Sequence, residues 1–246
     1  MSKAASLLFA LIAYAVFFAT FLYLIAFVGN LPWVPLTVDR GPSAAMGLAL
    51  LVDAALIALF GVQHSVMARQ GFKRAWKRVV PDAAERSFYV LAASAALILL
   101  FLFWRPIEGT LWTVGGAAAW VLWGLFALGW GIVLLSTFLI NHFELFGLQQ
   151  AWFHARGREA APPVFRQPFL YKQVRHPLYA GFFLAFWATP QMSYGHLFLA
   201  LGMSAYMLIA IVHEERDLVG LFGKDYEDYR ERVGMLMPRF RGRTPS

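Results

Sequence analysis

Long apolar stretches separated by short polar loops dominate the chain. Six of them run over residues 5–28, 44–67, 87–104, 116–140, 178–190 and 195–212. Several approach the roughly 20 residues that a helix needs to cross a bilayer. The pattern therefore predicts an all-α integral membrane protein, a helical bundle with five to six transmembrane helices.

The fifth apolar stretch is short, and residues 190–195 after it read as a turn. We therefore expect the fifth and sixth stretches to form a tight C-terminal helical hairpin, followed by a polar tail. Two possibilities remain open: the fifth stretch crosses fully, giving six spans, or stops short, giving five. We find no internal repeat at a fixed period, so an inverted-repeat transporter is not supported. The whole chain, 1–246, is expected to be a single membrane domain.

The polar loops alternate in charge. Basic residues gather in residues 69–86, in 141–177 and in the tail from Glu214, whereas 29–43 and 105–115 carry few charges. Cytoplasmic loops are enriched in Lys and Arg, so six crossings place both termini in the cytoplasm. In a chain that is 60% hydrophobic, this bias explains the net charge of +7 better than nucleic acid does. We expect membrane lipid around the protein, no nucleic acid and no obligate protein partner.

The chain has no cysteine. This composition excludes a disulfide, a thiolate metal site and a cysteine nucleophile.

Polar residues inside a membrane are expensive and often functional. Asp53 lies within the second stretch and His64 at its cytoplasmic end. Eleven positions apart, they share a helix face but are separated by about 16 Å. Each also has a structural interpretation, a helix–helix hydrogen bond for Asp53 and a satisfied interfacial histidine for His64. Asn141 and Glu144 share a face if the fourth helix continues, and would then point toward His64; a solvated helix end explains them equally well.

A polar stretch at residues 171–181 precedes the hairpin. Pro177 suits the first position of a helix, whose free N–H groups and dipole favour an anion. The alternative is a basic stretch that only sets topology. Glu214 and Glu215 end the sixth stretch, where acidic residues give no topological benefit. They are expected to bond Arg175, Lys172 or a cationic ligand.

Together these pieces resemble a known superfamily. The motifs Arg-His-Pro-Leu-Tyr-Xaa-Gly (175–181), Glu-Glu-Arg-Asp-Leu (214–218) and Phe-Gly-Lys-Asp-Tyr-Xaa-Xaa-Tyr (222–229) resemble those of the isoprenylcysteine carboxyl methyltransferases. These are membrane enzymes that use S-adenosyl-L-methionine. Gln-His-Ser-Val-Met-Ala-Arg (63–69), Glu-Arg-Ser-Phe-Tyr-Val-Leu (85–91) and Asn-His-Phe-Glu-Leu-Phe-Gly-Leu (141–148) resemble a narrower branch, the bacterial methanethiol S-methyltransferases, which are related to NnrU-type proteins.

The resemblance implies that S-adenosyl-L-methionine methylates a small thiol, methanethiol, to dimethyl sulfide in the bacterial inner membrane. Residues 1–140 would form a four-helix region on the substrate side, and residues 141–246 would bind the cofactor. The cofactor-binding residues implied are Lys172, Val174, Arg175, His176, Leu178, Tyr179, Glu214, Glu215 and Tyr226, with no metal site. Backbone N–H groups near 176–178 would bind the cofactor's carboxylate, and one glutamate its ribose or amino group. His64 is expected to accept the thiol proton, with Asp53, Asn141 and Glu144 as candidate partners.

One departure from the prenylcysteine enzymes favours a neutral substrate. Those enzymes carry an arginine about one turn before the glutamate pair, where this chain has only apolar residues, 208–212. A substrate carboxylate there would remain unpaired in an apolar site, which is unfavourable.

Three alternatives remain. One is a methyltransferase of the same fold that acts on a prenylcysteine or a phospholipid. Another is a non-enzymatic NnrU-like membrane protein that binds haem or metal through its histidines, although their spacing matches no metal motif. A transporter is the third, supported only by buried Asp53.

Overall fold

The computed structural model describes residues 2–158 and 164–239 of the chain. Five helices are long and apolar enough to cross a membrane: α1 (Lys3–Val28), α2 (Met46–Ala68), α4 (Asp82–Phe103), α5 (Gly116–Ile140) and α9 (Tyr194–Phe222). The shorter elements are α3 (Gln70–Trp76), β1 (Thr110–Thr113), α6 (His142–Leu145), α7 (Leu148–Arg156), a 3-10 turn (Phe169–Lys172), α8 (Pro177–Trp187), β2 (Gln191–Ser193) and α10 (Lys224–Arg232). The expected all-α membrane bundle is confirmed.

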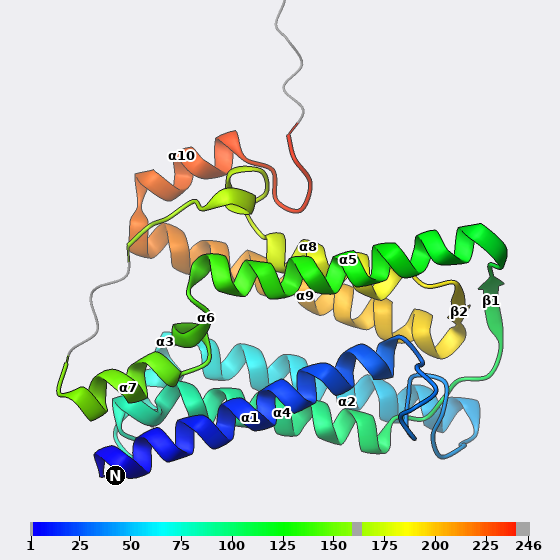
Figure 1. Cartoon of the computed structure of the whole chain (residues 1–246), viewed down its shortest axis with the longest axis horizontal. Helices are drawn as coiled ribbons and strands as arrows, with labels where there is room; N and C mark the ends of the chain where they lie inside the picture. The colour runs from blue at the N-terminus through cyan, green and yellow to red at the C-terminus, as the bar shows by residue number, and fades with distance from the viewer. Residues whose placement is uncertain (1, 159–163, 240–246) are drawn as a thin grey trace, which may run out of the picture.

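The long helices form two layers (Figure 1). One layer contains α1, α2 and α4, and the other contains α5, α8 and α9. Contacts between α2 and α9 join the layers. Because α5 packs closely on α8, it belongs to the layer of the later helices. Along the chain, the boundary between the two layers therefore falls before α5 and not at residue 140.

The α8–α9 segment forms the expected hairpin. With 11 residues, α8 is about 16 Å long, roughly half of a bilayer's hydrocarbon core. Beyond it, however, β2 pairs antiparallel with β1 from the α4–α5 loop, with Thr110 opposite Ser193 and Thr113 opposite Gln191. The chain therefore reaches the β1 end of the bundle before α9 returns. The start of α1 and the end of α9 lie together at the opposite end, which we call the basic end (Figure 1).

Two glycines allow α5 and α8 to approach at backbone distance. A Cβ on Gly129 would lie 2.6 Å from the amide nitrogen of Ala185, and one on Gly181 would lie 2.7 Å from the carbonyl oxygen of Gly129. Small residues permit such close helix packing in membranes. Gly129 is near the middle of α5, whereas Gly181 is in the second turn of α8. Measured along the two helices, the first residue of α8 therefore lies about 10 Å closer to the middle of the bundle than the last residue of α5.

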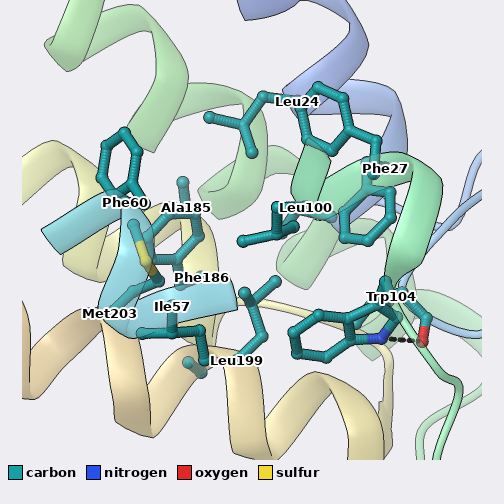
Figure 2. Close-up of a cluster of buried hydrophobic side chains, with 14 of the residues drawn as sticks. Leu24, Phe27, Ile57, Phe60, Leu100, Trp104, Ala185, Phe186, Leu199 and Met203 are labelled. Carbon is teal, nitrogen blue, oxygen red and sulfur yellow. Dashed lines mark hydrogen bonds between the residues drawn. The ribbon is translucent and has the colours of Figure 1, made fainter. Parts of the chain in front are cut away.

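A buried apolar cluster fills the space between the layers (Figure 2). Phe27, Leu100 and Trp104 from one layer meet Phe186 and Leu199 from the other. The Trp104 indole is fully buried and donates to the carbonyl oxygen of Val38 at 3.0 Å, so its polar atom is satisfied.

The α2–α9 contact is equally tight. A Cβ on Gly61 would lie 2.9 Å from the Tyr206 ring, and one on Gly202 would lie 2.8 Å from Ile57. These contacts fix His64, one turn after Gly61, relative to α9.

The fourth long helix does not continue through Asn141, as one interpretation of the sequence required. It ends at Ile140, and Asn141 instead caps α6, with its side chain accepting from the Glu144 N–H at 3.3 Å and donating to the Glu144 carboxylate at 2.9 Å. An asparagine that satisfies the free N–H groups of the next turn favours such a break. Gly147 follows in the left-handed region, at φ 88°, and leads into α7.

Candidate active site

Glu215 gathers three basic side chains at the basic end of the bundle. One carboxylate oxygen accepts from Arg175 Nε at 2.7 Å and lies 3.1 Å from His176 Nε2. The other oxygen lies 3.3 Å from Arg230 Nε. Only about 10% of the Glu215 side chain is exposed, so these charges compensate one another with little help from water. The expected bond between the glutamate pair and Arg175 is confirmed, and it ties the loop before α8 to α9 and α10.

Backbone contacts hold the same loop against the segment after α10. The N–H groups of Arg175 and His176 donate to the carbonyls of Gly234 and Met235, at 2.8 and 3.1 Å. His176 N–H is therefore not free for an anion, in contrast to the range 176–178 expected from the sequence. Across the described backbone, however, no carbonyl accepts from Leu178 or Tyr179 N–H, because both belong to the first turn of α8. An anion site at this helix start would use these two amides.

Glu214 lies near Tyr179 of the first turn of α8, beside that candidate anion site. It is exposed, unlike the neighbouring Glu215. Lys172 is also exposed, whereas Val174 is buried in the bridge to Gly234. The two glutamates thus differ: Glu215 is committed to protein cations, and Glu214 keeps a carboxylate edge accessible.

An aromatic cluster covers this region from the α10 side. Tyr226 and Tyr229 pack with Phe165 and Phe222, and both tyrosines are buried. Burial raises the pKa of Tyr229 to about 12, against the lowering effect of Arg175, and also raises the pKa of Tyr226. Both are therefore neutral hydroxyls. Tyr229 donates to the carbonyl oxygen of Tyr171 at 2.5 Å, whereas the buried Tyr226 hydroxyl has no partner among the described residues.

His64 lies deeper in the bundle, in the last turns of α2. Its Nε2 is 2.7 Å from the Tyr89 hydroxyl, and its buried Nδ1 has no partner among the described residues. Phe60 stacks on the imidazole with centroids 5.3 Å apart, and the Tyr206 ring meets its edge at 6.3 Å. A buried ring nitrogen without a partner in an aromatic setting suits a small molecule that donates a proton or a hydrogen bond to it.

The other candidate catalytic residues do not meet His64. Asp53 Oδ1 accepts from the backbone N–H of Arg105 at 2.9 Å, near the β1 end, where it joins α2 to the end of α4. Asn141 and Glu144 bond each other, and Asn141 also donates to Gln149 at 2.5 Å. The structure therefore gives these three residues local structural contacts.

Two further histidines have structural partners. His142 lies 2.8 Å from both the Tyr14 hydroxyl and Thr137 Oγ1, and His196 Nε2 lies 2.8 Å from the carbonyl oxygen of Phe186. In residues 2–158 and 164–239, no group of three His, Cys, Asp or Glu side chains is placed to hold a metal ion.

Tyr89, Tyr206 and Arg230 are site residues that the sequence did not predict. Tyr89 stands in the motif at 85–91, but its bond to His64 joins residues 25 positions apart. Tyr206 is a tyrosine inside an otherwise apolar part of α9, a position that polar residues seldom occupy without a partner. Arg230 follows Tyr229 in α10 and carried no distinguishing signal.

The chain is similar to curated proteins over almost its whole length. It is 52% identical over 238 residues to methanethiol S-methyltransferase 2 of Bradyrhizobium diazoefficiens, covering 97% of this chain and 92% of that protein. It is 49% identical over 239 residues to the methanethiol S-methyltransferase of Mycobacterium tuberculosis, covering 97% and 98%. Nurim of Danio rerio is a more distant relative, 28% identical over 181 residues, covering 69% of this chain and 64% of that protein.

No family model and no solved structure matches the chain. The two methyltransferases and this chain align from end to end at about half identity, far above what fold similarity alone requires. This chain belongs to the methanethiol S-methyltransferase family.

Proposed function

We propose that this protein transfers a methyl group from S-adenosyl-L-methionine to methanethiol, giving dimethyl sulfide. The observation that carries the proposal is the near full-length similarity to methanethiol S-methyltransferases, 52% identity over 97% of the chain. Two groups of polar atoms at different depths in the bundle support the proposal. The free N–H groups at the start of α8 form a candidate anion site, and a partly unpaired histidine, His64, lies deeper.

The residues at the basic end fit the proposed cofactor. The free N–H groups of Leu178 and Tyr179 suit its carboxylate, since a helix start favours anions. The accessible carboxylate of Glu214 suits its amino group or ribose hydroxyls, and the Tyr226 hydroxyl, without a partner among the described residues, offers one more hydrogen bond. Arg175, His176, Val174 and Glu215 hold the loop that presents these groups, while Lys172 lies exposed at its edge.

Bound S-adenosyl-L-methionine supplies an activated methyl group, so the protein must orient the acceptor and remove its proton. His64 is the proposed base, because its Nδ1 is buried and lacks a partner in the described part of the chain. Phe60 and Tyr206 enclose the imidazole, which restricts the acceptor to a small molecule and limits access of water. The apolar stretch Leu208–Val212 offers no cation for a carboxylate substrate.

The test is headspace gas chromatography over purified, detergent-solubilised protein that is given S-adenosyl-L-methionine and methanethiol. We expect dimethyl sulfide from the wild-type protein. His176→Ala should abolish both product and saturable cofactor binding, because His176 is a partner of Glu215 beneath the anion site. Cofactor binding without dimethyl sulfide would redirect the assignment to prenylcysteine or lipid acceptors, and absence of both would refute a methyltransferase.

His64→Ala should lower kcat at least about 100-fold while leaving S-adenosyl-L-methionine binding intact, since removal of a general base affects proton transfer. Calorimetry measures the binding and gas chromatography the turnover. Asp53→Asn serves as the comparison, because Asp53 contacts the Arg105 backbone and not His64. Normal turnover by His64→Ala would show that another group accepts the proton.

We also propose the cytoplasmic membrane as the location, with both termini in the cytoplasm. The start of α1 and the end of α9 share one end of the bundle (Figure 1), and the basic loops around α3 and after α5 lie there too. This orientation follows the excess of Lys and Arg in cytoplasmic loops.

A further inference from the structure

We infer that Tyr89 is a positioning residue that fixes the tautomer and orientation of His64, so that Nδ1 faces the thiol. The inference rests on the proposed role of His64 as the base. Tyr89 comes from α4 and His64 from α2, so the pair joins two helices of the same layer at the base itself.

The first support is the arrangement around the imidazole. A neutral imidazole has one nitrogen that donates and one that accepts. Nε2 lies 2.7 Å from the Tyr89 hydroxyl oxygen, whereas Nδ1 is buried without a partner among the described residues. When Nε2 carries the hydrogen, it donates to the Tyr89 oxygen, and Nδ1 holds a lone pair. In the opposite tautomer the Tyr89 hydroxyl would donate to Nε2, and Nδ1 would carry a hydrogen and could not accept the thiol proton, so the proposed base requires the Nε2–H tautomer.

The second support is the rigidity of Tyr89. The tyrosine is 7% exposed, and the Arg86 guanidinium lies 4.9 Å from its ring centroid. Arg86 is itself held, because its Nε donates to the carbonyl oxygen of Leu145 at 2.7 Å. A cation over the ring face stabilises the ring position, so the hydroxyl oxygen is held in place for Nε2.

Other polar groups near the pair come from each helix packed around it. Tyr206 and Glu214 of α9 lie near enough to Tyr89 to interact with it electrostatically, as do Arg86 and Glu85 of its own helix. Within residues 2–158 and 164–239, none of them forms a hydrogen bond with Nδ1, which therefore remains the ring nitrogen without a partner.

Bonds and protons balance in the proposed step. The thiol S–H bond breaks and its proton passes to Nδ1 of His64. The sulfur electron pair forms the bond to the methyl carbon, and the electron pair of the former carbon–sulfonium bond stays on the departing sulfur. Nε2–H keeps donating to the Tyr89 oxygen throughout, so the imidazolium retains one hydrogen-bond partner. Water takes the proton from Nδ1 once the products leave.

Tyr89→Phe tests the inference, since it removes the hydroxyl and keeps the ring beneath Arg86. We expect kcat to fall about 10- to 100-fold, with the KM for methanethiol and the affinity for S-adenosyl-L-methionine changed less than about twofold. Calorimetric cofactor binding in the same preparation shows that the variant is folded. A fall in affinity together with an unchanged kcat would overturn the inference.

The chain offers a matched control in Tyr14→Phe. Tyr14 also pairs with a histidine inside the bundle, His142, at 2.8 Å, but lies outside the proposed site. Tyr14→Phe should leave kcat unchanged. An equal loss in both variants would assign the effect to packing and refute a special role for Tyr89.

The double variant His64→Ala/Tyr89→Phe separates this inference from the base assignment. If Tyr89 acts through His64, the double variant should be no slower than His64→Ala alone. A further multiplicative loss would overturn the inference. If His64→Ala alone keeps full turnover, the proposed base is wrong; if it is inactive while Tyr89→Phe is fully active, only the role of Tyr89 is wrong.

Discussion

Glu215→Ala is expected to abolish saturable S-adenosyl-L-methionine binding and to lower the free energy of unfolding by about 3–5 kcal/mol. Removing the carboxylate leaves Arg175, His176 and Arg230 without their shared counter-ion in a mostly buried position. The loop before α8 would then lose its side-chain bond to α9, while Arg175 and His176 keep their backbone bonds to Gly234 and Met235. Calorimetry with S-adenosyl-L-methionine and thermal unfolding in detergent measure the two effects.

Asp217→Ala is the control for that variant. Asp217 lies two positions further along α9 and pairs with Arg69 at 3.3 Å, but its side chain is 54% exposed. A surface pair of this kind contributes less than about 1 kcal/mol, so we expect cofactor binding and stability close to wild type. Equal losses in the two variants would contradict the special role of the buried pair.

Gly129→Ala should give the second large effect, a protein that fails to reach the native α5–α8 packing or unfolds well below the wild-type temperature. The added Cβ would lie 2.6 Å from the amide nitrogen of Ala185 and 2.8 Å from the carbonyl oxygen of Gly181. These are backbone atoms, which cannot yield as a flexible side chain does, and overpacking typically costs about 1–3 kcal/mol or more. Because the proposed anion site lies at the start of α8, cofactor binding should weaken in parallel.

Gly131→Ala provides the comparison two positions along the same helix. Among the described residues, no atom outside its own helix backbone lies within 4 Å of the position that the new methyl group would take. That variant should be as stable as wild type or slightly more so, because alanine favours helix. Size-exclusion chromatography and thermal unfolding distinguish the two. Normal stability of Gly129→Ala would mean that α5 and α8 separate at no appreciable cost.

The long helices were predictable because hydrophobic length alone specifies them. The expected stretch 116–140 coincides with α5, and the stretch 5–28 with α1 to within two residues. Pro177 also marked the start of α8 correctly, since its ring prefers the first helical turn. Such local signals do not depend on the rest of the chain.

The candidate site was harder to predict because it depends on contacts between distant helices. The Arg175–Glu215 pair was within reach of sequence reasoning, because the two side chains carry opposite charges on either side of the predicted hairpin, although α9 continues past Glu215 to Phe222. The Tyr89–His64 bond was not, because periodicity does not reveal which tyrosine on α4 faces α2. The interpretation that α5 continues through Asn141 was wrong for the same reason. Whether Asn141 extends α5 or caps α6 depends on tertiary contacts such as that of Gly147 with Ser87.

Insertion of the chain into a bilayer must place α8 against a helix that already crosses it. A helix of 11 apolar residues is too short to span the hydrocarbon core by itself, and α5, on which α8 packs at backbone distance, is synthesised before it. The pairing of β2 with β1 then closes a loop of about 80 residues, counted from Thr113 to Gln191, on the far side of the membrane. We therefore expect the proposed anion site at the start of α8 to form late, after the α1–α2–α4 layer and α5 are in the lipid.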